Sequence, residues 1–227
     1  MNLKNNQLSR EKGLTLVELI VVISIFMIIT SVVIFNYSNF NSSVSLQNLT
    51  DDIALSIRKA QSFAIGARGV KESNASVDFN KSYGIHFSVE ESTGMTNPLA
   101  GSNKSFLMFS TLASSNKSYD MGNGSCGSTT TECIELFEIL SNDKIKSIVA
   151  TGDDGIIKPS SNIASVDIVF TRPDPRAVFC YKPTSASTCE SLSRVGVVIS
   201  NNQTDGTEKT KTISVQNTGQ ISIQQND

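Results

Sequence analysis

Two residues near the start of the chain, Gly13 and Glu18, form a combination that suggests chemistry. Gly13 separates a short basic leader from the apolar run Leu14 to Phe35, in which Glu18 is the only charged residue. An ionised carboxylate at membrane depth costs several kcal/mol unless it is paired. We therefore expect a partner for Glu18, and a plain membrane anchor would have no use for this charge.

The apolar run is long enough to cross a membrane. Its 22 residues would form a helix of roughly 33 Å, against a hydrocarbon core of about 30 Å. The leader carries Lys4, Arg10 and Lys12 against Glu11. The positive-inside rule then keeps the N-terminus in the cytoplasm. We predict a single-pass protein of the inner (cytoplasmic) membrane whose C-terminal domain is periplasmic or extracellular.

Two alternatives share part of this pattern. A secretory signal peptide has an apolar region of about 7–15 residues followed by a small-residue cleavage site. Here the apolar region is longer, and no such site follows it. A plain single-pass anchor explains the length and the basic flank, but it gives Gly13 and Glu18 no role.

Residues 13–18, GLTLVE, resemble the class III signal of type IV pilins and pseudopilins, which is written G-F-T-L-x-E. The resemblance implies cleavage after Gly13 by a prepilin peptidase and N-methylation of Leu14, where the family usually has Phe. It also implies that Glu18, with Thr15, serves assembly by pairing with the N-terminal amine of a neighbouring subunit. Opposite charges attract strongly in a low-dielectric medium. The alternative is a Glu18 that snorkels or is protonated near the membrane face.

The predicted helix continues beyond the membrane segment, because the first proline of the chain is Pro98. Apolar residues then recur at spacings of three and four, as in an amphipathic helix. They are Leu46, Leu49, Ile53, Ile57, Ala60 and Ala64. Gly66 and Gly69 supply a stop. We predict one helix from about Thr15 to Ile65, with a bend or local melting at Asn36–Asn39.

The remainder of the chain shows the alternation and turn residues of short strands. The strand candidates are Tyr83–Val89, Phe106–Leu112, Cys133–Leu140, Lys146–Ala150, Val166–Phe170, Ala177–Tyr181 and Arg194–Ser200. Residues 210–223 predict a hairpin with Asn217-Thr218-Gly219 in its turn. One long helix followed by strands predicts an α+β fold with an antiparallel sheet.

The combined prediction is a pilin-like α+β fold, with a long N-terminal helix packed on a C-terminal antiparallel β-sheet domain. The predicted parts are a cleaved leader (1–13), a transmembrane or filament-core helix (14–35), its amphipathic continuation (36–65) and a β-rich globular domain (66–227). Three short segments resemble the GspH/FimT-like minor pilins: YGIHF at 83–87, VFTRPDP at 169–175 and NTGQISI at 217–223.

This resemblance implies a structural subunit of a type IV pilus or a type II secretion pseudopilus. The implied partners are the prepilin peptidase/methyltransferase, other pilins or pseudopilins in a helical filament, and the inner-membrane assembly platform with its ATPase. The alternative functions are a DNA-binding or adhesive tip pilin and a plain membrane-anchored β domain. A binding role would use residues 94–132, whose composition predicts a surface loop around the strand candidate, or the Arg172–Arg176 turn. The C-terminal tail lacks Lys and Arg, which argues against DNA binding.

Four cysteines lie beyond the span, where oxidation is possible. Three connectivities exist for four cysteines. The close spacings favour Cys126–Cys133 and Cys180–Cys189. A zinc site is the alternative, although the spacings are wider than zinc sites usually have and histidine is scarce.

No catalytic constellation or cofactor motif is present in the sequence, so we expect neither an enzyme, nor a cofactor, nor a metal site. The single histidine, His86, lies in a predicted strand and is expected to be structural. Asp153-Asp154-Gly155 and Asp205-Gly206 predict turns and lack the full spacing of a calcium loop. The net charge is −2, and loss of the leader would make it about −4.

Overall fold

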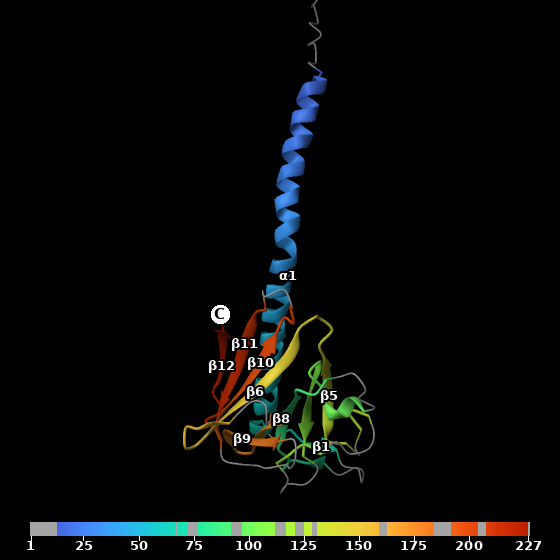
Figure 1. Cartoon of the computed structure of the whole chain (residues 1–227). Coiled ribbons are helices and arrows are strands. Elements are labelled where there is room, and N and C mark those ends of the chain that lie inside the picture. Colours follow the sequence, from blue (N-terminus) through green and yellow to red (C-terminus); the bar gives the residue numbers. More distant parts are fainter. Residues whose placement is uncertain are drawn as a thin grey trace, which may run out of the picture. The chain divides into compact units, whose positions relative to one another are not determined.

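The computed structural model describes residues 13–66, 68–71, 77–91, 97–111, 117–120, 125–128, 131–158, 163–183, 192–203 and 208–226. The chain divides into two compact units, Met1–Asn41 and Ser42–Asp227. One long helix, α1 (Leu16–Ile65), contributes residues to both units (Figure 1).

Helix α1 confirms the predicted single helix of about fifty residues. It begins at Leu16 and ends at Ile65, where the backbone N–H of Gly66 donates to the carbonyl of Ser62 at 2.8 Å. The polar patch Asn36–Asn39 is helical, so the predicted local melting does not occur there. The absence of proline and the apolar stripe suffice to explain this continuity.

The second unit contains two five-stranded antiparallel sheets and one two-stranded sheet (Figure 1). The first sheet has the order β12-β11-β10-β6-β7, the second has the order β5-β4-β3-β8-β9, and β1 pairs with β2. The strands are β1 (Val70–Lys71), β2 (Val77–Asp78), β3 (Tyr83–Ser88), β4 (Ser105–Ser110), β5 (Cys133–Glu138), β6 (Lys144–Gly152), β7 (Ile157–Lys158), β8 (Ile163–Thr171), β9 (Asp174–Pro183), β10 (Leu192–Ser200), β11 (Thr210–Gln216) and β12 (Ile221–Asn226). A 3-10 turn, η1 (Pro98–Ala100), precedes β4.

Every strand candidate named from the sequence corresponds to an observed strand, and the α+β prediction is confirmed. The terminal hairpin is also confirmed, with Gly219 in its turn at a φ of 85° that favours glycine. The sequence missed β1, β2 and β7, because two residues are too short to show an alternation. It also did not predict the separation of the strands into two large sheets.

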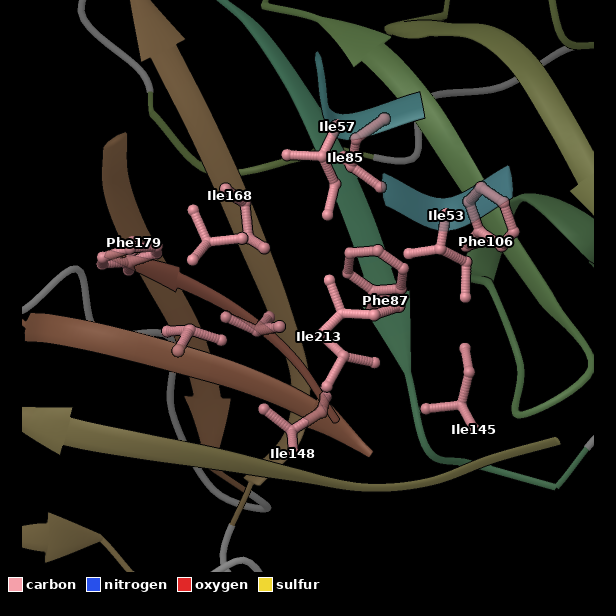
Figure 2. Close-up of a cluster of buried hydrophobic side chains, with 14 of the residues drawn as sticks. Ile53, Ile57, Ile85, Phe87, Phe106, Ile145, Ile148, Ile168, Phe179 and Ile213 are labelled. Atoms are coloured by element: carbon pink, nitrogen blue, oxygen red, sulfur yellow. The ribbon is translucent and has the colours of Figure 1, made fainter. Parts of the chain in front are cut away.

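The main hydrophobic core lies between the second half of α1 and the two large sheets. All six stripe residues predicted from the sequence are buried in it. Figure 2 shows Ile53 and Ile57 of α1 among side chains from both sheets, including Phe87 of β3 and Ile213 of β11. The amphipathic half of the helix therefore forms part of the core.

A second, smaller cluster covers the opposite face of the second sheet. Its buried members are Leu99, Leu107, Phe109, Tyr119, Cys133 and Val169. The strand β4 serves both clusters because Phe106 and Met108 pack in the main core, whereas Leu107 and Phe109 face the smaller one. Strand β4 confirms the strand candidate within residues 94–132. The surface-loop prediction for the rest of this segment is wrong at Leu99 of η1 and at Tyr119, which are buried in the smaller cluster.

Candidate functional site

The predicted processing and assembly residues lie at the start of α1. Thr15 directly precedes the helix, and its Oγ1 accepts a hydrogen bond from the backbone N–H of Glu18 at 3.3 Å. The carbonyl of Thr15 accepts from the N–H of Leu19 at 3.1 Å. Thr15 is thus the N-cap, and Glu18 occupies the third helical position. Threonine and glutamate at this spacing form the capping-box pattern.

The surroundings of this helix start are open. Apart from its neighbours along the chain, no described residue has an atom within 4 Å of the position that a Cβ on Gly13 would occupy. Glu18 is exposed and lies in the first turn, where the partial positive charge of the helix N-terminus favours a carboxylate. The site therefore offers an accessible peptide bond after Gly13 and an unburied acidic group four positions beyond Leu14.

The segment that follows is an apolar surface that no described part of the chain covers. Leu16–Ile34 has a mean hydropathy of 2.8, could span a membrane by length and composition, and has none of its residues buried. The hydroxyls of Ser24 and Thr30 donate to the carbonyls of Ile20 and Phe26, each at 2.8 Å. Because these polar groups are satisfied within the helix, they add little cost to burial in lipid or against another helix.

One of the two predicted disulfides is confirmed. Cys126 and Cys133 form a disulfide, with their Cα atoms 4.8 Å apart. Cys189 lies outside the described residues, so the Cys180–Cys189 pairing stays a prediction. The observed bond joins the segment before β5 to β5 itself, next to the smaller cluster.

His86 is buried in a polar arrangement that the sequence could not show. It lies opposite Asp167 in the β3–β8 ladder, and its Nδ1 is 2.6 Å from Oδ1 of Asp167. Its Nε2 is 3.2 Å from the carbonyl of Ala100. Asp167 also accepts from Ser118 Oγ at 3.0 Å and from the N–H of Tyr119 at 2.9 Å. The His86–Asp167 pair thus links the segments at Ala100 and at Ser118–Tyr119 to the sheet by hydrogen bonds. This arrangement agrees with the structural role expected of His86.

Arg172 and Pro173 form the turn between β8 and β9, whereas Arg176 lies within β9. Nη2 of Arg176 is 2.6 Å from Oδ2 of Asp174. Hydrogen bonds from the Arg176 side chain and backbone hold the pKa of Asp174 below its ordinary value. Nη1 of Arg172 donates to the carbonyl of Phe79 at 3.4 Å. The Asp174 carboxylate offsets the charge of Arg176, whereas the hydrogen bond from Arg172 to a carbonyl leaves its guanidinium charged.

The two aspartate–glycine motifs have different outcomes. Asp154 Oδ1 accepts from the N–H of Ile156 at 3.0 Å, so the first motif forms the predicted turn, between β6 and β7. The second, at Asp205, lies outside the described residues. Within the part of the chain that the structure describes, no group of three potential metal ligands occurs.

Comparison with known proteins yields a family match at the N-terminus. Residues 8–34 match the family model described as the prokaryotic N-terminal methylation motif. No curated protein and no solved structure matches the chain. The matched residues include Gly13, Leu14, Thr15 and Glu18, together with the whole exposed apolar segment.

Proposed function

We propose that this chain, which carries the class III prepilin signal of the type IV pilin superfamily at residues 8–34, is a minor pilin or pseudopilin. In this role it is a structural subunit that is processed, methylated and inserted into a helical filament. The observation that carries the proposal is the exposed apolar half of α1 with one carboxylate, Glu18, in its first turn.

Processing would act at the accessible peptide bond after Gly13. A prepilin peptidase would release residues 1–13, and methylation would follow on the new α-amino group of Leu14. In the processed chain this amine would be one residue from the N-cap Thr15. A positive charge next to a helix N-terminus is unfavourable, so the amine gains from a carboxylate partner.

Assembly would bring that partner from a second subunit. Glu18 of one subunit would pair with the Leu14 amine of its neighbour as both helices enter the apolar interior of the filament. Pairing removes two separate costs of burying charge, and it fixes the position of one subunit against the next. The apolar surface of residues 14–35 would pack against neighbouring helices, whereas the unit that begins at Ser42 contributes its own closed core.

The proposed parts are the leader 1–13, the filament-core helix 14–35, the amphipathic continuation 36–65 and the globular domain 66–227. Before assembly, the chain would be anchored in the inner membrane with its N-terminus in the cytoplasm. An assembly platform and its ATPase would supply the work of extraction. The arrangement of a long helix with two antiparallel sheets supports a GspH/FimT-like subunit of a type IV pilus or a type II secretion pseudopilus. We advance no DNA-receptor role, because Arg176 is ion-paired with Asp174.

Replacement of Gly13 tests the proposal. Gly13→Val should block removal of the leader in cells that contain the peptidase, because a branched side chain would occupy the cleavage point. The same variant should fold normally, since a Cβ at this position would meet no described residue beyond its chain neighbours within 4 Å. Leu14→Phe, which restores the residue usual in the family, is the control and should be cleaved. Intact-mass measurement of the membrane fraction distinguishes the two forms, and normal cleavage of Gly13→Val would contradict the proposal.

A further inference from the structure

Lysine side chains gather around the first turns of α1 in the second unit. Nζ of Lys209 donates to Oγ of Ser43 at 2.8 Å, and Nζ of Lys211 donates to Oε1 of Gln47. Strand β6 begins beside them, because Ser45 Oγ donates to Oδ2 of Asp143 at 2.6 Å. This strand adds two further lysines. We call the four residues Lys144, Lys146, Lys209 and Lys211 the lysine collar.

The collar has an excess of positive charge, although the whole chain has a net charge of −2. Among the described residues, three carboxylates lie close to its four ammonium groups. Asp51 accepts a hydrogen bond at 2.9 Å from Nε2 of Gln47, the residue that Lys211 contacts. Asp143 is buried and accepts hydrogen bonds from Ser45 and Ser141. Glu208 is 2.8 Å from Nζ of Lys146, and hydrogen bonds from Lys146 and Ser200 lower its pKa.

The collar also lies close, along the chain, to the candidate membrane span. The span ends at Ile34, and Ser43 follows nine residues later within the same helix. Nine helical residues extend about 14 Å. Ser43 therefore lies at most about 14 Å beyond the end of the span, whatever angle the helix makes with the membrane. The headgroup layer adds about 5–7 Å to each side of the hydrocarbon core, and charges interact over a Debye length of about 8 Å. Asp51 lies about 12 Å beyond Ser43 along the helix, on the side of the collar that is farther from the span.

We propose that the lysine collar binds anionic phospholipid headgroups while the chain is anchored in the membrane. The proposal rests on the membrane anchoring given under Proposed function. Ammonium groups attract phosphate headgroups, and the attraction weakens with salt. The contact would hold the subunit against the membrane surface before assembly and would be lost when the subunit is extracted.

The chain provides a matched pair of lysines to test this surface. Lys146 and Lys59 are each ion-paired with a glutamate, and their side chains are 43% and 42% exposed. Lys59 lies sixteen residues beyond Ser43 on α1, about 24 Å away along the helix. Full-length chain would be placed in nanodiscs of phosphatidylcholine alone or of an equimolar mixture with phosphatidylglycerol. Lysine acylation would then be followed by mass spectrometry at low and high salt.

In the anionic discs, Lys146 and Lys209 should react about fivefold more slowly than in phosphatidylcholine discs at low salt. High salt should remove the difference, and Lys59 should react equally in both lipids. The double variant Lys144→Gln/Lys209→Gln should return Lys146 towards its rate in phosphatidylcholine, whereas Lys59→Gln should not. Circular dichroism would establish that both variants are folded.

Equal acylation of Lys146 and Lys209 in both lipids would overturn the proposal. Protection by added polyglutamate, without protection by phosphatidylglycerol, would assign the collar to an acidic protein partner and would also overturn it. Failure of the chain to enter nanodiscs is a different result, because it would contradict the membrane anchor itself and the collar proposal with it.

Discussion

The two halves of α1 are one continuous helix with opposite surroundings. In Leu16–Ile34 the large apolar side chains are exposed around the helix, and none is buried by the rest of the chain. From Leu46 to Ala64 the six residues of the apolar stripe are buried against two sheets, whereas Leu55, outside the stripe, is exposed. The second half finds its partner within its own chain, whereas the first half requires lipid or other subunits. The comparison shows that the buried half of the helix contributes to folding of the chain, whereas the exposed half is left available for contacts with lipid or other subunits.

Removal of the single charge in the first half should have the largest effect. Glu18→Ala should leave cleavage intact but weaken subunit docking by about 3–5 kcal/mol, because the amine of the neighbour would be buried without its partner. The measurement is the fraction of the chain in sheared filaments against that in membranes. Glu90→Ala, at an exposed position of the globular unit, is the control. Wild-type incorporation of Glu18→Ala would show that the first half needs no charge pairing.

A core truncation in the second half should act on folding instead. Ile57 is fully buried, and Ile57→Ala should lower the free energy of unfolding by about 3 kcal/mol through lost burial and the cavity that remains. Ile25→Ala, at a position that is 54% exposed, should leave that free energy unchanged. Urea unfolding of the full chain in detergent, followed by near-ultraviolet circular dichroism of its tyrosines, measures both. Equal losses of unfolding free energy in the two variants would contradict the claim that only the second half of α1 contributes to the folded core.

The N-cap should have a smaller effect, confined to the helix start. Thr15→Val keeps the shape of the side chain but removes the oxygen that accepts from the N–H of Glu18, at a cost of about 1 kcal/mol. Hydrogen exchange of that N–H in micelles should become about fivefold faster. Thr15→Ser should restore the wild-type rate. An unchanged rate in Thr15→Val would mean that the hydroxyl does not cap the helix.

The division of α1 into an exposed and a buried half, and most of the strands, could be predicted from the sequence because they follow from local periodicity. Uninterrupted apolarity predicted the exposed half, spacings of three and four predicted the buried stripe, and alternation predicted nine strands that the structure contains. Residues 13–18 carry a signal that can be recognised without any fold. These features depend only on neighbours along the chain.

The features that were missed depend on long-range contacts. The pairing of His86 with Asp167 joins residues 81 positions apart, and only the register of β3 against β8 brings them together. The burial of β4 within a segment rich in serine and asparagine depends on its position between β3 and β5. The lysine collar likewise combines the start of β6, the start of β11 and the first turns of the buried half of α1. No local pattern contains such information.

The most direct test of the account is the mass and N-terminal sequence of the chain purified from its native membrane or filaments. The account predicts a chain that starts at Leu14, lacks residues 1–13 and carries one methyl group on its α-amine. A chain that retains the leader, or one whose N-terminus lies at another position, would contradict the proposal that the exposed half of α1 is processed for assembly.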